Sequence, residues 1–155
     1  MAAGSVNPSG GVFNPLFKHY LFANNAVLPI MTSSEIQFIK AEAAFRKGGD
    51  LTPALTAYTK GIDLHFDFIN RSGFPRSNVV LYTNLPISAA ERAAYLNGNN
   101  VKRTTGTLTL TDIMLQKYIA LWGWGFFETF VDIRRYHWTD LDPATGLQVY
   151  KTMVF

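Results

Sequence analysis

The chain of 155 residues contains no cysteine. It therefore has no disulfide, no thiol nucleophile, no zinc site with thiolate ligands and no cysteine that could carry a lipid. Without cysteines, the sequence gives no indication of the redox compartment in which the protein works.

Charged residues are also scarce. They make up 16% of the sequence, no run of Lys and Arg is longer than two, and the formal net charge is +3. Proteins that bind nucleic acids gather basic residues into a patch or stripe. This sequence is too poor in them, and we expect no nucleic-acid partner.

Long hydrophobic runs are missing as well. The longest, residues 118–127, is well short of the roughly 20 residues that span a bilayer. The first residues lack the basic region followed by an apolar region that marks a secretory signal. We therefore predict no transmembrane helix and no signal peptide, and we expect residues 1–31, rich in Gly, Asn and Pro, to form a flexible or loop-like lead-in.

Apolar and aromatic residues, in contrast, are plentiful. They make up 48% and 14% of the chain, which is enough to build the core of one domain. We assign residues 32–155 to that domain. The many aromatic side chains indicate either a tightly packed core or a surface that another element covers, and the sequence alone does not separate the two.

The first helix is predicted to open at Thr32, whose hydroxyl can cap the helix while Glu35 completes a capping box. Gly48 and Gly49 should end it, because glycine adopts positive φ freely. Two apolar stripes lie on opposite sides, so we expect the helix to be sandwiched between neighbours. One stripe is Ile36, Ile39 and Ala43, and the other is Phe38, Ala41 and Phe45.

A second helix follows after a short loop, with Pro53 in its first turn. Its apolar residues fall on a single stripe, so the two helices should form an antiparallel pair. The order of small residues from Ala44 to Ile62 matches a helical hairpin of the tetratricopeptide type. One copy is visible, so internal repetition does not establish an array.

The rest of the chain alternates connections and helices. We predict a third helix over residues 88–97, opened by a capping box of Ser88 and Glu91. A fourth helix should begin at Leu110, and Gly123 and Gly125 should loosen or break it before a fifth helix over residues 126–136. Residues 79–82 could form a short extended piece, and residues 147–155 an edge strand. The expected fold class is all-α, or mainly α, with long irregular loops.

Charged residues stand within the apolar stretch 110–136. Lys117 falls in the middle of an apolar stripe that contains Leu110, Ile113, Met114, Leu121 and Trp124, so its ammonium group must reach solvent or meet a carboxylate. Glu128 and Asp132 are the nearest candidates, and Arg135 shares their helix face. We predict a structural ion network of Lys117, Glu128, Asp132 and Arg135.

Patterns for other chemistry are weak or absent. His19, His65 and His137 have no metal-site spacing, and we predict that His65 packs at the edge of an apolar stripe. Asp140 and Asp142 with Gly146 resemble a calcium loop faintly, but Ala144 stands where an oxygen ligand is needed, so we interpret them as a turn. No nucleotide-binding or esterase motif is present. We expect no metal and no cofactor.

Three stretches together resemble the SusD/RagB family of outer-membrane nutrient-binding proteins, in its SusD-like branch. They are residues 31–50 (MTSSEIQFIKAEAAFRKGGD), the partner helix residues 54–62 (ALTAYTKGI), and residues 107–140 (TLTLTDIMLQKYIALWGWGFFETFVDIRRYHWTD). The similarity covers roughly residues 28–140 and consists of long composite patterns. Its matching motifs, residues 41–43, 116–117 and 128–135, are expected to be architectural.

The resemblance implies a mostly helical fold with tetratricopeptide-like hairpins and a location on the cell surface at the outer membrane. It also implies capture of oligosaccharides or other oligomeric nutrients for a SusC-like TonB-dependent transporter. Members of the family are several times longer and begin with a lipoprotein signal, so we expect this chain to be a C-terminal portion of such a protein. We also expect it to expose apolar stripes that neighbouring repeats would cover, such as Ile36, Ile39 and Ala43, and to self-associate or dissolve poorly.

Ligand contacts are expected from aromatic residues, because an indole face covers the apolar face of a sugar ring. Trp138 and Tyr136 are the candidates, whereas Trp124 is expected in the core. Two alternatives stay open. One is a helical scaffold that binds another protein through an aromatic surface. The other is a glycoside hydrolase that uses Glu128 and Asp132 as acid and base.

Overall fold

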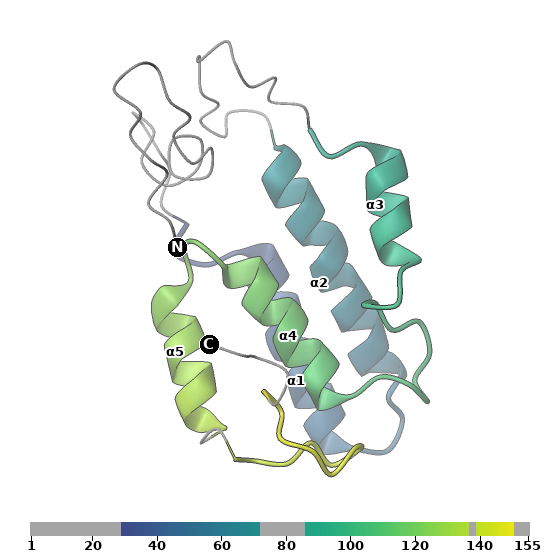
Figure 1. Cartoon of the computed structure of the whole chain (residues 1–155), viewed down its shortest axis with the longest axis vertical. Coiled ribbons are helices and arrows are strands. Elements are labelled where there is room, and N and C mark those ends of the chain that lie inside the picture. The colour runs from purple at the N-terminus through teal and green to yellow at the C-terminus, as the bar shows by residue number, and fades with distance from the viewer. Residues whose placement is uncertain (1–28, 72–85, 137–138, 151–155) are drawn as a thin grey trace, which may run out of the picture.

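The computed structural model describes residues 29–71, 86–136 and 139–150, and these form five α-helices and no strand. The expectation of a mainly helical fold is therefore confirmed. Helix α4 contacts α1, α2 and α5, and α1 pairs with α2. In Figure 1, α3 and α5 lie on opposite sides of the group formed by α1, α2 and α4. None of the described helices is both long and apolar enough to cross a membrane.

Helix α1, Ser33–Lys47, begins and ends where local sequence predicts. The hydroxyl of Thr32 accepts a hydrogen bond from the amide of Glu35 at 3.1 Å, which satisfies one of the free N–H groups of the first turn. Gly48 ends the helix with φ of 73°, a conformation that costs glycine little.

The prediction that α1 is sandwiched between two neighbours is wrong. Its Phe38, Ala41 and Phe45 stripe is buried, but Ile36 and Ile39 on the other side are exposed. An apolar stripe indicates that a face favours burial, and it does not supply the element that buries it.

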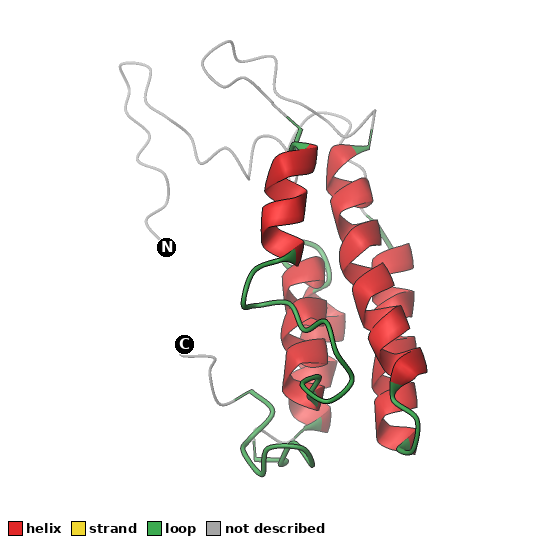
Figure 2. Cartoon of the chain, turned by 90° about the vertical axis from the view of Figure 1, so that its right-hand side faces the viewer, coloured by secondary structure: helices red, strands yellow, loops and turns green. Residues whose placement is uncertain are grey.

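Helix α2, Thr52–Asn70, packs along α1, with Pro53 in its first turn as predicted. Its buried side chains include Tyr58, which meets the ring of Phe38 edge to face with centroids 6.4 Å apart. The hydroxyl of Ser34 donates to the carbonyl of Gly61 at 2.8 Å. These contacts hold α1 and α2 together as a pair, and α4 packs against both of them. The view of Figure 2, turned by 90° from Figure 1, shows the helices packed side by side.

Helix α3, Ala89–Leu96, opens with the predicted capping box of Ser88 and Glu91. Arg92 joins α3 to α2 through Asp63 and Asp67, each 2.7 Å from a guanidinium nitrogen. Asn70 at the end of α2 exchanges two hydrogen bonds with the backbone of Ile87. The polar face of α2 is thus used to hold α3.

Helices α4, Leu110–Leu121, and α5, Phe126–Arg135, are separated by a turn with Gly123 at φ of 95°. The predicted break is confirmed. A β-carbon added to Gly125 would lie 2.5 Å from Cδ2 of Leu121 and 2.7 Å from its Cβ. Only glycine therefore allows α5 to turn back so closely on the end of α4.

Replacing Gly125 with alanine should lower the free energy of unfolding by about 1–3 kcal/mol, because Leu121 must leave its buried position to relieve the overlap. Chemical denaturation followed by circular dichroism measures the change. The matched control is Gly106→Ala, since nothing lies within 4 Å of a β-carbon at Gly106. Equal stability of the two variants would contradict the steric account.

The C-terminal segment is organised by Asp142, which is completely buried. One carboxylate oxygen accepts the amide of Thr111 in the first turn of α4 at 2.6 Å, and the other accepts the amide of Ala144 at 3.0 Å. The turn interpretation of residues 140–146 therefore holds, because these oxygens already serve the backbone. Up to residue 150 the predicted edge strand is only an isolated bridge between Leu141 and Gln148.

Some predictions fall outside the described residues. These are the lead-in up to residue 28, the extended piece at residues 79–82, the end of the edge strand, and His19, His137 and Trp138. The domain boundary between residues 31 and 32 and the tetratricopeptide-like pairing remain predictions.

Candidate functional site

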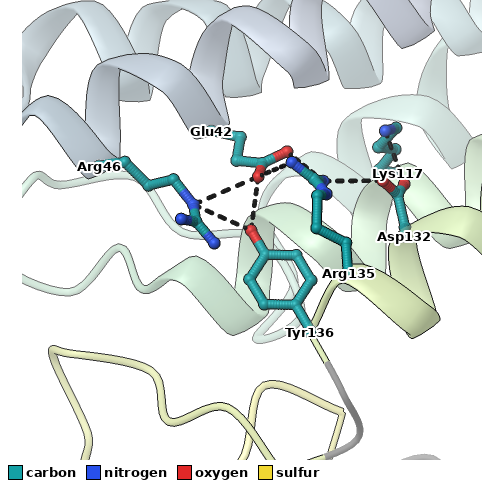
Figure 3. A network of polar contacts seen from close by, with 6 residues as sticks. All are labelled: Glu42, Arg46, Lys117, Asp132, Arg135 and Tyr136. Atoms are coloured by element: carbon teal, nitrogen blue, oxygen red, sulfur yellow. Dashed lines mark hydrogen bonds and ion pairs between the residues drawn. The ribbon is translucent and has the colours of Figure 1, made fainter.

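The inward face of α5 carries part of an ion network, and Asp132 lies toward one end of it (Figure 3). Its carboxylate lies 2.6 Å from Nζ of Lys117 on α4 and 2.8 Å from a guanidinium nitrogen of Arg135. Lys117 and Asp132 are both buried. The ammonium group that falls in the apolar stripe of α4 thus meets a carboxylate within the protein, as charge burial requires.

The network continues to α1 through Glu42. Arg135 donates two hydrogen bonds to its carboxylate, at 2.6 and 2.9 Å, in the paired geometry that suits guanidinium and carboxylate. The hydroxyl of Tyr136 donates to the same carboxylate at 2.5 Å, and Arg46 lies 3.4 Å from it (Figure 3). Three helices, α1, α4 and α5, are therefore tied together by one set of charges.

The charged states follow from this pairing. Burial acts to raise the pKa of Glu42, but the hydrogen bonds from Arg135 and Tyr136 outweigh it and hold the pKa below its usual value. Burial and the bond to Glu42 raise the pKa of Tyr136. For Arg135, burial opposes the charge, but Glu42 and Asp132 outweigh it and the pKa is raised. Glu42 therefore stays ionised at neutral pH.

Glu128, which the sequence places in this network, makes no ion pair with its members in the described part of the chain. It is seven residues before Arg135, or about 10 Å along the helix axis, and Lys117 is already paired with Asp132. Glu42 on α1 is instead the second carboxylate of the network, and it pairs with Arg135. Because Asp132 is held between two cations, the Glu128–Asp132 pair lacks the free carboxylate that a glycoside hydrolase needs.

Tyr136, a residue predicted to contact a ligand, is buried where α5 ends. Its side chain is buried, its hydroxyl is engaged by Glu42, and its ring meets that of Tyr150 with centroids 6.0 Å apart. The ring therefore presents no exposed face in this structure, although Tyr136 lines a surface pocket of about 550 Å³, and its role as a ligand contact stays a prediction. Trp138 lies outside the described residues and remains a prediction.

Trp124 does not continue the stripe of α4, because that helix ends at Leu121. The indole is half-buried, its N–H donates to the carbonyl of Ala120 at 3.0 Å, and its ring lies 5.1 Å from that of Phe68 on α2. It packs in the turn between α4 and α5 and forms part of the wall of a surface pocket described next.

This pocket, of about 320 Å³, lies where the chain enters α1 and α5 begins. Glu35 and Glu128 are its two charged residues. Glu35 is buried, and burial raises the pKa of its carboxyl. Sequence analysis noted Glu35 only as a capping residue. The other residues that line the pocket are Pro29, Ile30, Met31, Thr32, Leu121, Trp124, Gly125, Phe126 and Phe127.

His65 lies in apolar surroundings on α2. It borders a cavity of about 190 Å³ whose walls include Phe38, Ile62 and Phe66, and its ring is 6.3 Å from that of Trp124. Burial lowers the pKa of His65 from its ordinary 6.5 to about 4. The residue packs as a neutral imidazole. The described residues contain no cluster of three or more His, Asp or Glu that could hold a metal ion.

Comparison with known families identifies a match over most of the chain. The model of a SusD-like family, described as "Starch-binding associating with outer membrane", matches residues 6–154, nearly the whole chain. No curated protein and no solved structure matches the chain. The match includes α1, α4 and α5, which the ion network joins, as well as the residues before α1 from residue 6 onward.

Proposed function

The chain belongs to this SusD-like family of starch-binding proteins that associate with the outer membrane, and on that premise we propose that it is a glycan-binding component of a SusC/SusD-type nutrient uptake system. The ligand class is an oligosaccharide, the partner is a SusC-like TonB-dependent transporter, and the location is the outer surface of the outer membrane. The single observation that carries the proposal is the family match over residues 6–154.

The proposed role is binding without catalysis. Members of the family are named for binding, and the carboxylates of the charge network support the same conclusion. Glu42 and Asp132 are each held by cationic side chains, so neither serves as a general acid or base. The network instead fixes α1, α4 and α5 as a rigid frame for loops that would carry the ligand contacts.

Calorimetry with linear α-glucan oligosaccharides of increasing length tests the proposal, with β-linked glucans of the same lengths as the control ligands. We expect saturable binding of the α-glucans, and no shorter products after prolonged incubation. Failure to bind any glucan would contradict the assignment of the ligand, and cleavage products would contradict the non-enzymatic role.

Trp138 remains our proposed aromatic contact. Trp138→Ala should weaken glucan binding without changing the melting temperature. Trp122→Ala is the matched control, because Trp122 is an exposed tryptophan at the end of α4. A large loss of stability in Trp138→Ala would instead assign the residue to the core.

The exposed apolar side chains of α5 support the second candidate function, a helical scaffold that binds another protein without a small ligand. The glucan titrations distinguish the two functions, since a scaffold would bind none of the sugars.

A further inference from the structure

Helix α5 turns its apolar face to solvent. Phe126, Phe127, Phe130 and Val131 have exposed fractions of 69%, 74%, 50% and 59%. Their spacing of i, i+1, i+4 and i+5 places them on one face of the helix. The opposite face carries the buried Asp132. In an ordinary surface helix the apolar face is buried and the charged face meets solvent, so these side chains of α5 show the reverse arrangement. A contiguous aromatic face of this kind marks a surface that another element covers.

The chain itself reaches the beginning of this face. Ile30 and Met31, just before α1, line the same pocket as Phe126 and Phe127. Both are exposed, Ile30 to 91% and Met31 to 61%. The described chain therefore begins beside the start of α5.

Those preceding residues carry a matching apolar pattern. Leu16, Phe17, Tyr20 and Leu21 have the same spacing of i, i+1, i+4 and i+5 as the exposed residues of α5. Seven residues, 22–28, separate these four apolar residues from the described chain, and a stretch of that length can span roughly 23 Å when extended. Helix α5 has ten residues and is therefore about 15 Å long. The turn can thus reach any point along the helix.

Charge supports the same pairing. The pocket at the start of α5 is lined by Glu35 and Glu128 and by no Lys or Arg. Lys18 lies between the apolar residues of the upstream turn and would bring a positive charge to this pocket. In addition, the family match begins at residue 6, so residues 16–21 fall within the same match as α5.

We propose that residues 16–21 dock as a short amphipathic turn on the exposed face of α5, with Leu16, Phe17, Tyr20 and Leu21 against the aromatic residues of that helix. The N-terminal segment is then part of the packed domain, and the lead-in assignment of residues 1–31 is replaced by an intramolecular interface. This inference goes beyond the glycan-binding role and does not depend on it.

Paramagnetic relaxation enhancement in the full chain tests the proposal. The protein has no cysteine, so His19→Cys gives a single attachment site for a nitroxide, on the side of the turn away from its apolar residues. We expect the amide signals of Phe127, Phe130 and Val131 to lose more than half their intensity relative to the reduced label. Signals of α3, on the other side of the helical group, should keep theirs (Figure 1).

Two controls make the result specific. Adding Phe17→Ser and Tyr20→Ser to the labelled chain should restore the α5 signals, whereas Phe22→Ser, which lies off the apolar face of the turn, should not. A mixture of spin-labelled chain with isotope-labelled wild type reports contacts between molecules. Broadening of α5 only in that mixture would assign the face to a second copy, and no broadening in either sample would overturn the proposal.

Discussion

Replacing Lys117 with methionine is expected to lower the free energy of unfolding by about 3–5 kcal/mol, the range found when one partner of a buried ion pair is removed. Methionine keeps most of the aliphatic volume, so the loss reports the charge. Asp132 would remain buried with Arg135 as its only cation. Urea denaturation followed by tryptophan fluorescence and circular dichroism measures the change.

Lys102→Met is the matched control for this experiment. Lys102 lies 3.8 Å from Asp112 and is partly exposed, so its loss should cost less than about 1 kcal/mol. The double variant Lys117→Met with Asp132→Leu should be more stable than Lys117→Met alone, because it leaves no unbalanced carboxylate, and Arg135 keeps its bonds to Glu42. A cost for Lys117→Met as small as that for Lys102→Met would contradict the buried network.

The stability of the protein should fall between pH 6.5 and about 4 because of His65. Its pKa is 6.5 in an unfolded chain and about 4 in the folded state, where burial disfavours the imidazolium. The unfolded state therefore binds more protons than the folded state in this pH range. The stability that the neutral His65 contributes at neutral pH is lost as the pH falls. The full loss attributable to His65 is roughly 3 kcal/mol. Denaturation curves recorded from pH 7.5 to pH 3.5 measure it.

His65→Leu isolates this contribution, since leucine suits the apolar cavity and does not titrate. Other groups act in both proteins: the lowered pKa of Glu42 also favours high pH, and the raised pKa of Glu35 favours low pH. The difference between the two proteins should change only across the His65 interval. Parallel curves for wild type and His65→Leu would show that the imidazole is not desolvated.

Helix boundaries follow from local residues, which is why the sequence locates them well. Thr32 and Ser88 accept hydrogen bonds from amides three residues later, and Gly48 supplies positive φ at the end of α1. Each of these effects acts within one turn of helix. Gly123, with its positive φ, likewise follows the end of α4. Trp124 therefore lies outside the helix, although its spacing from Leu121 had predicted that it continues the apolar stripe.

Contacts between residues far apart in the chain are not specified by local sequence. From the sequence, Lys117 must reach solvent or meet a carboxylate, and Glu128 and Asp132 are both candidates. Which one lies closer depends on how α5 turns back on α4. The bond between Arg135 and Glu42 joins residues 93 positions apart, and no local pattern specifies it.

By itself, the sequence determined that the protein is a cysteine-free helical chain of the SusD-like family, where its helices begin and end, and that Lys117 must reach solvent or meet a carboxylate. These properties depend on composition, on hydrogen bonds within one turn and on the cost of an unpaired charge. Only the tertiary structure decided that Glu42 completes the network, that Tyr136 is buried and that the phenylalanines of α5 face solvent. Apolar spacing marks a face, but helix packing decides which face meets a neighbour and which charges come within reach.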